Sequence, residues 1–158
     1  MVLDANATAQ LRKYLELVSL PIELAASLDD SAASAKTRDL LDEIAALSPL
    51  VTVTSEPDER TPSFAVRRAG TEVSVLPMGH EFASLVLALV QVGGHHPRLD
   101  EETAAAVRGL EGGKFVTYMS LTCQNCPTVV QALNTMSVIN PRIRHVAVEG
   151  GTFQEEVE

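Results

Sequence analysis

The sequence predicts an α/β protein that contains two copies of a strand–helix–strand unit. Short stretches of alternating apolar residues, typical of strands, are interleaved with stretches in which apolar residues recur at helical spacing. The segment from residue 28 to Pro49 runs from the end of an expected strand to the break after the next helix. The segment from residue 121 to Pro141 does the same, about 92 or 93 residues later. A hydrophobic content of 46% with 21% charged residues is typical of a globular protein.

The first copy follows an expected N-terminal helix. Residues 11–18 carry apolar side chains at helical spacing, with Asn6 or Thr8 as the candidate cap, and Pro21 ends the stretch. The pattern then predicts a half-buried strand at 22–28, a turn and helix cap at 29–31, a helix with its apolar face at 40–47, and a strand at 50–53.

A hairpin and a buried helix complete the first copy. Two short strands are expected at 64–66 and 73–76, with a turn at 68–70 between them, and residues 82–92 are apolar nearly all round, which predicts a buried helix. This order of elements is typical of thioredoxin-like folds. Such folds place a cis proline where this chain has Pro62, although the residue is explained most simply as the start of a strand.

The second copy repeats the strand–helix–strand unit and then stops. We expect a helix after Asp100, a strand at 115–121, a helix over 129–136, a strand at 143–148 and the start of a helix at Thr152. The hairpin and closing helix of the first copy have no counterpart before residue 158. We therefore expect the second unit to be cut short, with completion by another segment or chain as the alternative.

The predicted organisation is two fused thioredoxin-like units of three-layer α/β/α type. A unit without cysteines is expected at 1–97, and a partial unit with both cysteines at 98–158.

The composition excludes several classes of partner. A formal charge of −9 and the lack of clustered Lys and Arg argue against nucleic acid. The longest apolar stretch, at 85–90, is too short to span a membrane, and the first residues do not resemble a signal peptide. We therefore expect a cytoplasmic protein, in which two closely spaced cysteines are catalytic or metal-binding more often than structural.

The cysteines form a Cys-x-x-Cys motif at the predicted junction between a strand and a helix. A sulfur at a helix N-terminus is stabilised as a thiolate by the helix dipole and by unpaired N–H groups. We expect Cys123 to be the exposed attacking thiol and Cys126, one helical turn further on, to be the shielded resolving thiol. Pro127 fits the first turn, where its missing N–H costs nothing. The motif predicts a reversible dithiol/disulfide, whereas the first copy has Asp30 and Ala33 at the aligned positions and is expected to be chemically silent.

Other interpretations stay open from the residues alone. One is a zinc site made of the two cysteines and two histidines, although the spacing matches no zinc-finger pattern. The candidate histidines are His80, His95, His96 and His145. Another is a pair of inert buried thiols. Glu81, just before the all-apolar helix, is explained more simply by a favourable interaction with the helix dipole than by catalysis.

Five segments make the chain resemble a known family. They are residues 24–32, 79–89, 120–127, 136–143 and 150–154. Across essentially its whole length the chain resembles the N-terminal domain of the F subunit of bacterial alkyl hydroperoxide reductase. The resemblance implies two fused thioredoxin-like folds, the first without cysteines, which agrees with the internal repeat.

The resemblance also implies an activity and partners. The family's F subunit is a flavoprotein that passes electrons from NADH, through FAD and a cysteine pair, to the disulfide of a peroxiredoxin, the C subunit. By resemblance, Cys123 is the attacking thiol, Cys126 its partner, and Glu81 an acid near the pair that gives or takes a proton. Gln124 stands where the family commonly has His. FAD and NADH are expected in the family's C-terminal domains and no cofactor in this chain, which has no Gly-x-Gly-x-x-Gly stretch.

A different class of function is the alternative to this thiol–disulfide relay. Because the second unit stops before its hairpin, its sheet would have an open edge that could pair with another chain. The chain would then be a non-catalytic interaction or dimerisation module, present as a homodimer.

Overall fold

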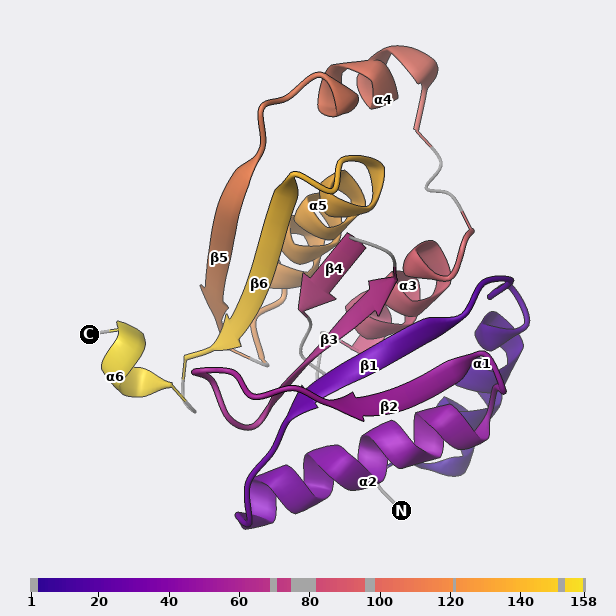
Figure 1. Cartoon of the computed structure of the whole chain (residues 1–158), viewed down its shortest axis with the longest axis vertical. Coiled ribbons are helices and arrows are strands. Elements are labelled where there is room, and N and C mark those ends of the chain that lie inside the picture. Colours follow the sequence, from indigo (N-terminus) through magenta and orange to yellow (C-terminus); the bar gives the residue numbers. More distant parts are fainter. Residues whose placement is uncertain are drawn as a thin grey trace.

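Figure 1 shows a computed structural model of the chain, in which a twisted sheet is flanked by helices. The structure describes residues 3–68, 71–74, 82–95, 99–120, 122–150 and 153–157. The helices are α1 (Ala5–Leu15), α2 (Ala32–Ala46), α3 (Phe82–Val92), α4 (Glu101–Arg108), α5 (Cys126–Ile139) and α6 (Gln154–Val157). The strands are β1 (Ile22–Ser27), β2 (Val51–Ser55), β3 (Ser63–Arg68), β4 (Thr71–Ser74), β5 (Gly113–Met119) and β6 (Ile143–Glu149). None of the described helices is both long and apolar enough to cross a membrane.

Among the described residues the strands form a single sheet in the order β2-β1-β3-β4-β6-β5. Strands β1 and β2 are parallel and are separated in sequence by α2, and strands β5 and β6 are parallel and are separated by α5. The starts of β2 and β6, at Val51 and Ile143, agree with the predicted offset between the copies. The α/β class, the thioredoxin-like order of elements and the internal repeat are therefore confirmed.

Helices α1 and α2 each have a side-chain cap just before their first residue. Helix α2 begins after Ser31 as predicted, since the Ser31 Oγ accepts a hydrogen bond from the Ser34 N–H at 3.1 Å. Helix α1 was expected to be capped by Asn6 or Thr8. It begins after Asp4 instead, because the Asp4 carboxylate accepts the Ala7 N–H at 2.7 Å.

Strand β1 is buried on both faces, and the prediction of a half-buried strand was wrong. Leu24 lies in the apolar core, but Ala25 and Ser27 on the other side are only 8% and 6% exposed. The strand lies inside the sheet between β2 and β3, and the loop after β2 folds over its end. In that loop Asp58 donates its N–H to the Ser27 Oγ at 3.0 Å, and Thr61 lies 2.7 Å from the same oxygen.

The hairpin after this loop is present as β3 and β4, which pair antiparallel. The peptide bond between Thr61 and Pro62, just before β3, is cis. The predicted turn at 68–70 and the end of the returning strand at 75–76 lie partly or wholly outside the described residues.

One face of the sheet carries the main apolar core. The core gathers side chains from α1, α2, α3, β1, β3 and β4, among them Leu11, Leu15, Leu24, Leu40, Leu41, Ile44, Val66, Val73, Leu85 and Leu89. Helix α3 begins and ends where the sequence predicts, and most of its side chains are buried. Helix α5 continues the layer, since it packs against α3, β4 and β6. The short helix α6 lies near the opposite face, where Tyr118 donates a hydrogen bond to Glu156 at 2.8 Å.

Helix α5 buries only part of the apolar pattern that predicted it. That pattern was Val129, Val130, Leu133 and Met136; Val130 is buried but Val129 is 49% exposed, and the polar Asn134 and Ser137 are buried as well. Two of the three inward positions are therefore polar. One of them, Asn134, has a buried partner on β6, because His145 hydrogen-bonds to it.

Several contacts join the copies, and two of them involve whole elements. Strand β4 pairs with β6 in parallel over only two residue pairs, Val73 with His145 and Ser74 with Val146. Helices α3 and α5 also lie side by side in Figure 1. The predicted boundary between residues 97 and 98 falls outside the described residues.

Candidate redox site

Cys123 and Cys126 form a disulfide at the start of α5, with their Cα atoms 5.5 Å apart. The sequence placed Cys123 at the helix N-terminus and Cys126 one turn inside the helix. In the structure Cys126 is the first helical residue, and Cys123 lies in the turn that precedes the helix. Both cysteines are half-buried.

The turn before α5 is held by hydrogen bonds from Ser120. The Ser120 carbonyl accepts the Cys123 N–H at 3.1 Å, and the Ser120 Oγ accepts the Thr122 N–H at 3.2 Å. Asn125 occupies the position before the helix but makes no side-chain cap, and Pro127 lies in the first turn as predicted. Because no side chain caps it, the start of α5 has N–H groups that can stabilise negative charge on a nearby sulfur.

Below the disulfide, Cys126 packs against a small apolar cluster. Its buried members are Met119 at the end of β5, Val130 on α5 and Ala147 on β6. The cluster fixes the first turn of α5 against the ends of both strands. Cys126 is thereby packed against apolar side chains.

The second copy also contains three hydrogen-bonded polar side chains, centred on the buried His145. The His145 side chain, 1% exposed, places Nε2 2.8 Å from the Thr117 Oγ1 and Nδ1 2.7 Å from the Asn134 Oδ1. Burial lowers the pKa of His145 from 6.5 to about 4, because the charged imidazolium would lose its hydration. If the amide oxygen of Asn134 faces the ring, Nδ1 donates to it and Nε2 accepts from Thr117. The histidine is thus a neutral core residue.

The zinc interpretation gains no support from the described residues. Within them, no three side chains of His, Cys, Asp and Glu lie close enough together to hold a metal ion. His145 is engaged by Thr117 and Asn134, and His95 is exposed, while His80 and His96 lie outside the described residues. Disulfide sulfurs are also not thiolates, the form of cysteine that binds zinc.

Glu81 lies outside the described residues, and helix α3 begins at the next residue, Phe82. The first turn of α3 contacts α5 through a hydrogen bond of 3.2 Å from the Gln131 side-chain amide to the Ser84 Oγ. Further along, the Gln91 amide lies 3.4 Å from the Thr135 hydroxyl. The two helices therefore run side by side with their N-terminal ends together, and α5 starts at Cys126.

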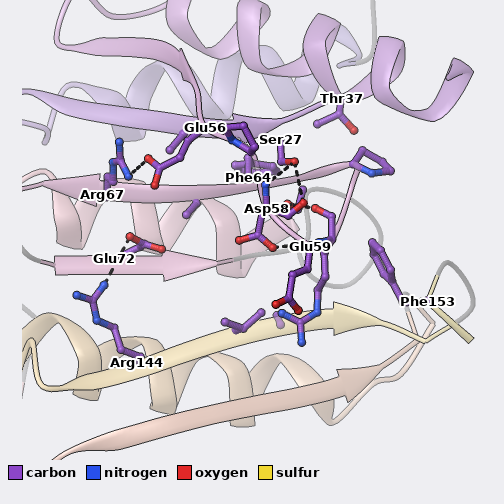
Figure 2. A pocket seen from close by; sticks show the side chains of 18 of the residues that line it. Ser27, Thr37, Glu56, Asp58, Glu59, Phe64, Arg67, Glu72, Arg144 and Phe153 are labelled. Atoms are coloured by element: carbon purple, nitrogen blue, oxygen red, sulfur yellow. Dashed lines mark hydrogen bonds and ion pairs between the residues drawn. The ribbon is translucent and has the colours of Figure 1, made fainter. Parts of the chain in front are cut away.

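A groove that the sequence analysis missed lies on the face of the sheet opposite the main core (Figure 2). It has a volume of about 560 Å³ and is lined by β1, β3, β4, β6 and the loop after β2. Arg67 pairs with Glu23 and Glu56, and Arg144 lies 3.5 Å from Glu72. Two of these ion pairs connect neighbouring strands, β1 with β3 and β4 with β6, and the third connects β3 with the loop after β2. No sequence motif marks the groove, because its residues meet only once the strand order is known.

Comparison with known proteins shows that the chain is similar to one part of a longer reductase subunit. The chain matches no family model. It is 54% identical to the F subunit of alkyl hydroperoxide reductase from Pseudomonas putida, over 99% of this chain and 31% of that protein. The chain thus spans 31% of the length of that relative.

Solved structures show the same fold. The N-terminal domain of the F subunit of alkyl hydroperoxide reductase from Enterococcus faecalis matches with a TM-score of 0.87 at 27% identity, over 98% of this chain and 83% of that one. A protein disulfide oxidoreductase from Aeropyrum pernix shares the fold, with a TM-score of 0.81 at 22% identity, over 98% of this chain and 78% of that one.

The fold and the cysteine pair define the class: a thioredoxin-like protein with a Cys-x-x-Cys disulfide at the start of a helix. The identity to the Pseudomonas protein extends over nearly the whole chain and includes both copies of the repeat. The chain therefore belongs with the N-terminal domain of the F subunit of alkyl hydroperoxide reductase.

Proposed function

We propose that the chain is a thiol–disulfide relay domain of a flavoprotein peroxiredoxin reductase. The disulfide between Cys123 and Cys126, at the uncapped start of α5, is the observation that carries the proposal. A flavin module that is oxidised in the step would supply two electrons, and two protons would convert the disulfide into two thiols. The flavin and NADH would be bound by the larger part of the protein, as the likeness to the longer reductase relatives suggests. The expected cytoplasmic location agrees with a couple that must be kept reduced.

Reduction of the peroxiredoxin then takes two exchange steps. The Cys123 thiolate attacks one sulfur of the partner's disulfide, which forms a mixed disulfide and releases the partner's other sulfur as a thiolate. The Cys126 thiolate next attacks the Cys123 sulfur, restores the disulfide of this chain and releases the second thiolate of the partner. The partner gains two electrons and this chain loses two. The uncapped N–H groups at the start of α5 favour the thiolate form of Cys123.

Redox titration tests the couple directly. We expect the two cysteines to titrate together between about −150 and −330 mV, the range of thiol–disulfide relay proteins and the glutathione pools. Cys126→Ser should accumulate a mixed disulfide with an oxidised two-cysteine peroxiredoxin, because the resolving thiol is gone, whereas Cys123→Ser should form none. Electrophoresis without reductant measures both. Absence of a Cys123–Cys126 couple in the wild-type chain would contradict the proposal.

Glu81 is the proposed proton donor and acceptor for this couple. Support comes from its neighbours: helix α3 begins at the next residue, and its Ser84 hydrogen-bonds to Gln131 of α5. We expect Glu81→Gln to slow exchange with the peroxiredoxin about tenfold and to change the pH dependence of the rate, since one acid–base group is removed. The exposed Glu101→Gln on α4 serves as the control and should change neither. An unchanged pH profile for Glu81→Gln would contradict the proton-transfer role and leave the interaction with the helix dipole as the explanation of Glu81.

The division at residues 97 and 98 remains part of this proposal: a first unit that supplies Glu81 and a second that carries the disulfide. Strand β5 lies at the end of the sheet and pairs only with β6 among the described residues. That edge favours the second candidate, an interaction module that pairs with another chain. A stable dimer in light scattering, together with failure to reduce a peroxiredoxin disulfide, would favour the module over the relay.

A further inference from the structure

The longest stretch of the sequence without charge surrounds the disulfide. Between Lys114 and Arg142 there is no Asp, Glu, Lys, Arg or His, in a chain of which 21% is charged. This stretch contains both cysteines and the whole of α5. In a protein with a formal charge of −9, the redox centre is therefore built from neutral residues.

Part of this stretch faces solvent around the cysteines. We call it the neutral surface, and its exposed residues are Thr122, Gln124, Asn125, Thr128 and Val129. Four of them offer hydroxyl or amide groups. The fifth, Val129, is 49% exposed and belongs to neither apolar core. One exposed valine is ordinary on a protein surface, so its position relative to the disulfide carries the argument.

Val129 lies beside the disulfide. It follows Cys126 by three residues on α5, a spacing that puts the two Cβ atoms about 5–6 Å apart. Side chains on a helix also tilt toward its N-terminus, so Val129 leans toward the turn that carries Cys123. The next residue, Val130, faces inward and fills the cluster beneath Cys126. The core under α5 is thus complete without Val129.

We propose that the neutral surface is the docking site for the protein whose disulfide Cys123 attacks, and that Val129 is its apolar anchor. The partner that fits is an uncharged, partly apolar segment next to the partner's own disulfide. For sulfur to attack sulfur the two surfaces must touch and exclude water. A charge on either surface would then be buried without a counter-ion, which costs affinity. The amide and hydroxyl groups around Val129 can satisfy the partner's backbone.

This inference rests on the proposed relay function, and the test separates the two. The reduced chain is mixed with an oxidised two-cysteine peroxiredoxin, or with 2-hydroxyethyl disulfide, a small uncharged probe that needs no docking. We expect Val129→Glu to slow the reaction with the peroxiredoxin by about tenfold or more. Its reaction with the small disulfide should slow much less, because there the added carboxylate acts on the thiolate but not on docking. Val129→Thr, which keeps the shape without adding charge, should slow the peroxiredoxin reaction much less.

Leu110→Glu is the matched control. Leu110 is 44% exposed, close to the 49% of Val129, but it precedes β5 whereas the cysteines follow β5. This variant should react with both disulfides as the wild type does. Val129 is an exposed helical position, so unchanged thermal unfolding of Val129→Glu would confirm that the variant is folded.

Each remaining outcome contradicts a specific statement. If Val129→Glu slows both reactions by the same factor, or slows neither, the docking role of Val129 is wrong while the relay stands. If the wild-type chain reduces the small disulfide but not the peroxiredoxin, the proposed function fails and this inference fails with it.

Discussion

The two copies of the repeat close the same strand–helix junction by different means. In the first copy, the Asp29 carboxylate accepts hydrogen bonds from the Ser31 N–H at 2.9 Å and the Ser34 hydroxyl at 2.7 Å, and Ser31 caps α2. In the second copy, the disulfide closes the turn and no side chain caps α5. Hydrogen bonds hold the first junction whatever the redox conditions, whereas the second can be opened and closed by two electrons.

The difference shows that the same strand–helix junction can have a structural role in one copy and a redox role in the other. The hydrogen bonds from Ser31 and Ser34 lower the pKa of Asp29 from 3.8 to about 2, so its carboxylate keeps its charge, and these hydrogen bonds, even in mild acid. A side-chain cap in the second copy would occupy the N–H groups that can stabilise the Cys123 thiolate. The missing cap is thus consistent with a redox role.

The apolar cores beneath the two junctions also differ: the first is large and the second is small. Beneath the first lies the main core, to which α1, α2 and α3 all contribute. Beneath the second, three buried apolar residues and Cys126 form a small cluster, followed by the polar group around His145. The first copy is therefore expected to carry most of the stability, and the second most of the chemistry.

Truncation of one core leucine should have the largest effect on stability. Leu41→Ala removes a side chain that is 0% exposed in the main core, and we expect it to cost about 2–5 kcal/mol of unfolding free energy. Val130→Ala, also at 0% exposure, should cost roughly 2 kcal/mol, since fewer carbon atoms are removed from a smaller cluster. Urea unfolding of both variants under identical redox conditions measures the difference. Equal costs would contradict the expectation that the first copy carries most of the stability.

Acid should weaken the second copy before the first. The pKa of His145 is lowered by burial to about 4 from 6.5, so the unfolded chain binds this proton first and stability falls as the pH drops from about 6.5 to about 4. Asp29, with a pKa of about 2 instead of 3.8, loses its contribution only below about pH 4.

Unfolding free energies measured across this range test the order. His145→Gln should flatten the part of the curve between pH 6.5 and 4, at some cost in stability at neutral pH. An unaltered slope in that variant would show that other groups control the acid response.

The smallest effect comes from the helix caps. Ser31→Ala should cost about 1 kcal/mol, because the Ser34 N–H loses its acceptor. Asn125→Ala at the matched position of α5 should cost less than about 0.5 kcal/mol, since Asn125 makes no side-chain cap. Thermal unfolding of the two variants compares them directly. If Asn125→Ala were the more damaging change, an uncapped start of α5 would be the wrong description.

Much of this arrangement was predictable because it depends on local chemistry. The buried helix α3 follows from residues that are apolar on every side, the start of α2 from Ser31, and the repeat from two similarly spaced prolines. The cysteine motif was visible for the same reason. The helix was expected to begin at Cys123. It begins three residues later, at Cys126, because Ser120 holds the preceding residues in a turn.

The features that escaped the sequence analysis all depend on contacts between distant segments. The burial of Asn134 and Ser137 on α5 has no signal in the sequence, and Asn134 finds its partner, His145, only once β6 packs against the helix. Strand β1 was taken as half-buried because alternation cannot show that a strand lies inside a sheet. The pairing of β4 with β6 could not be foreseen, since either copy could have ended as a separate sheet.

That short pairing has a consequence for how the repeat can be divided. Backbone hydrogen bonds pass through β4 and β6, and Val138 of α5 packs on the core of the first copy. A chain cut between the copies would expose both the edge of β4 and the α3–α5 contact. The repeat is therefore not a unit of folding, and we expect neither copy to fold alone.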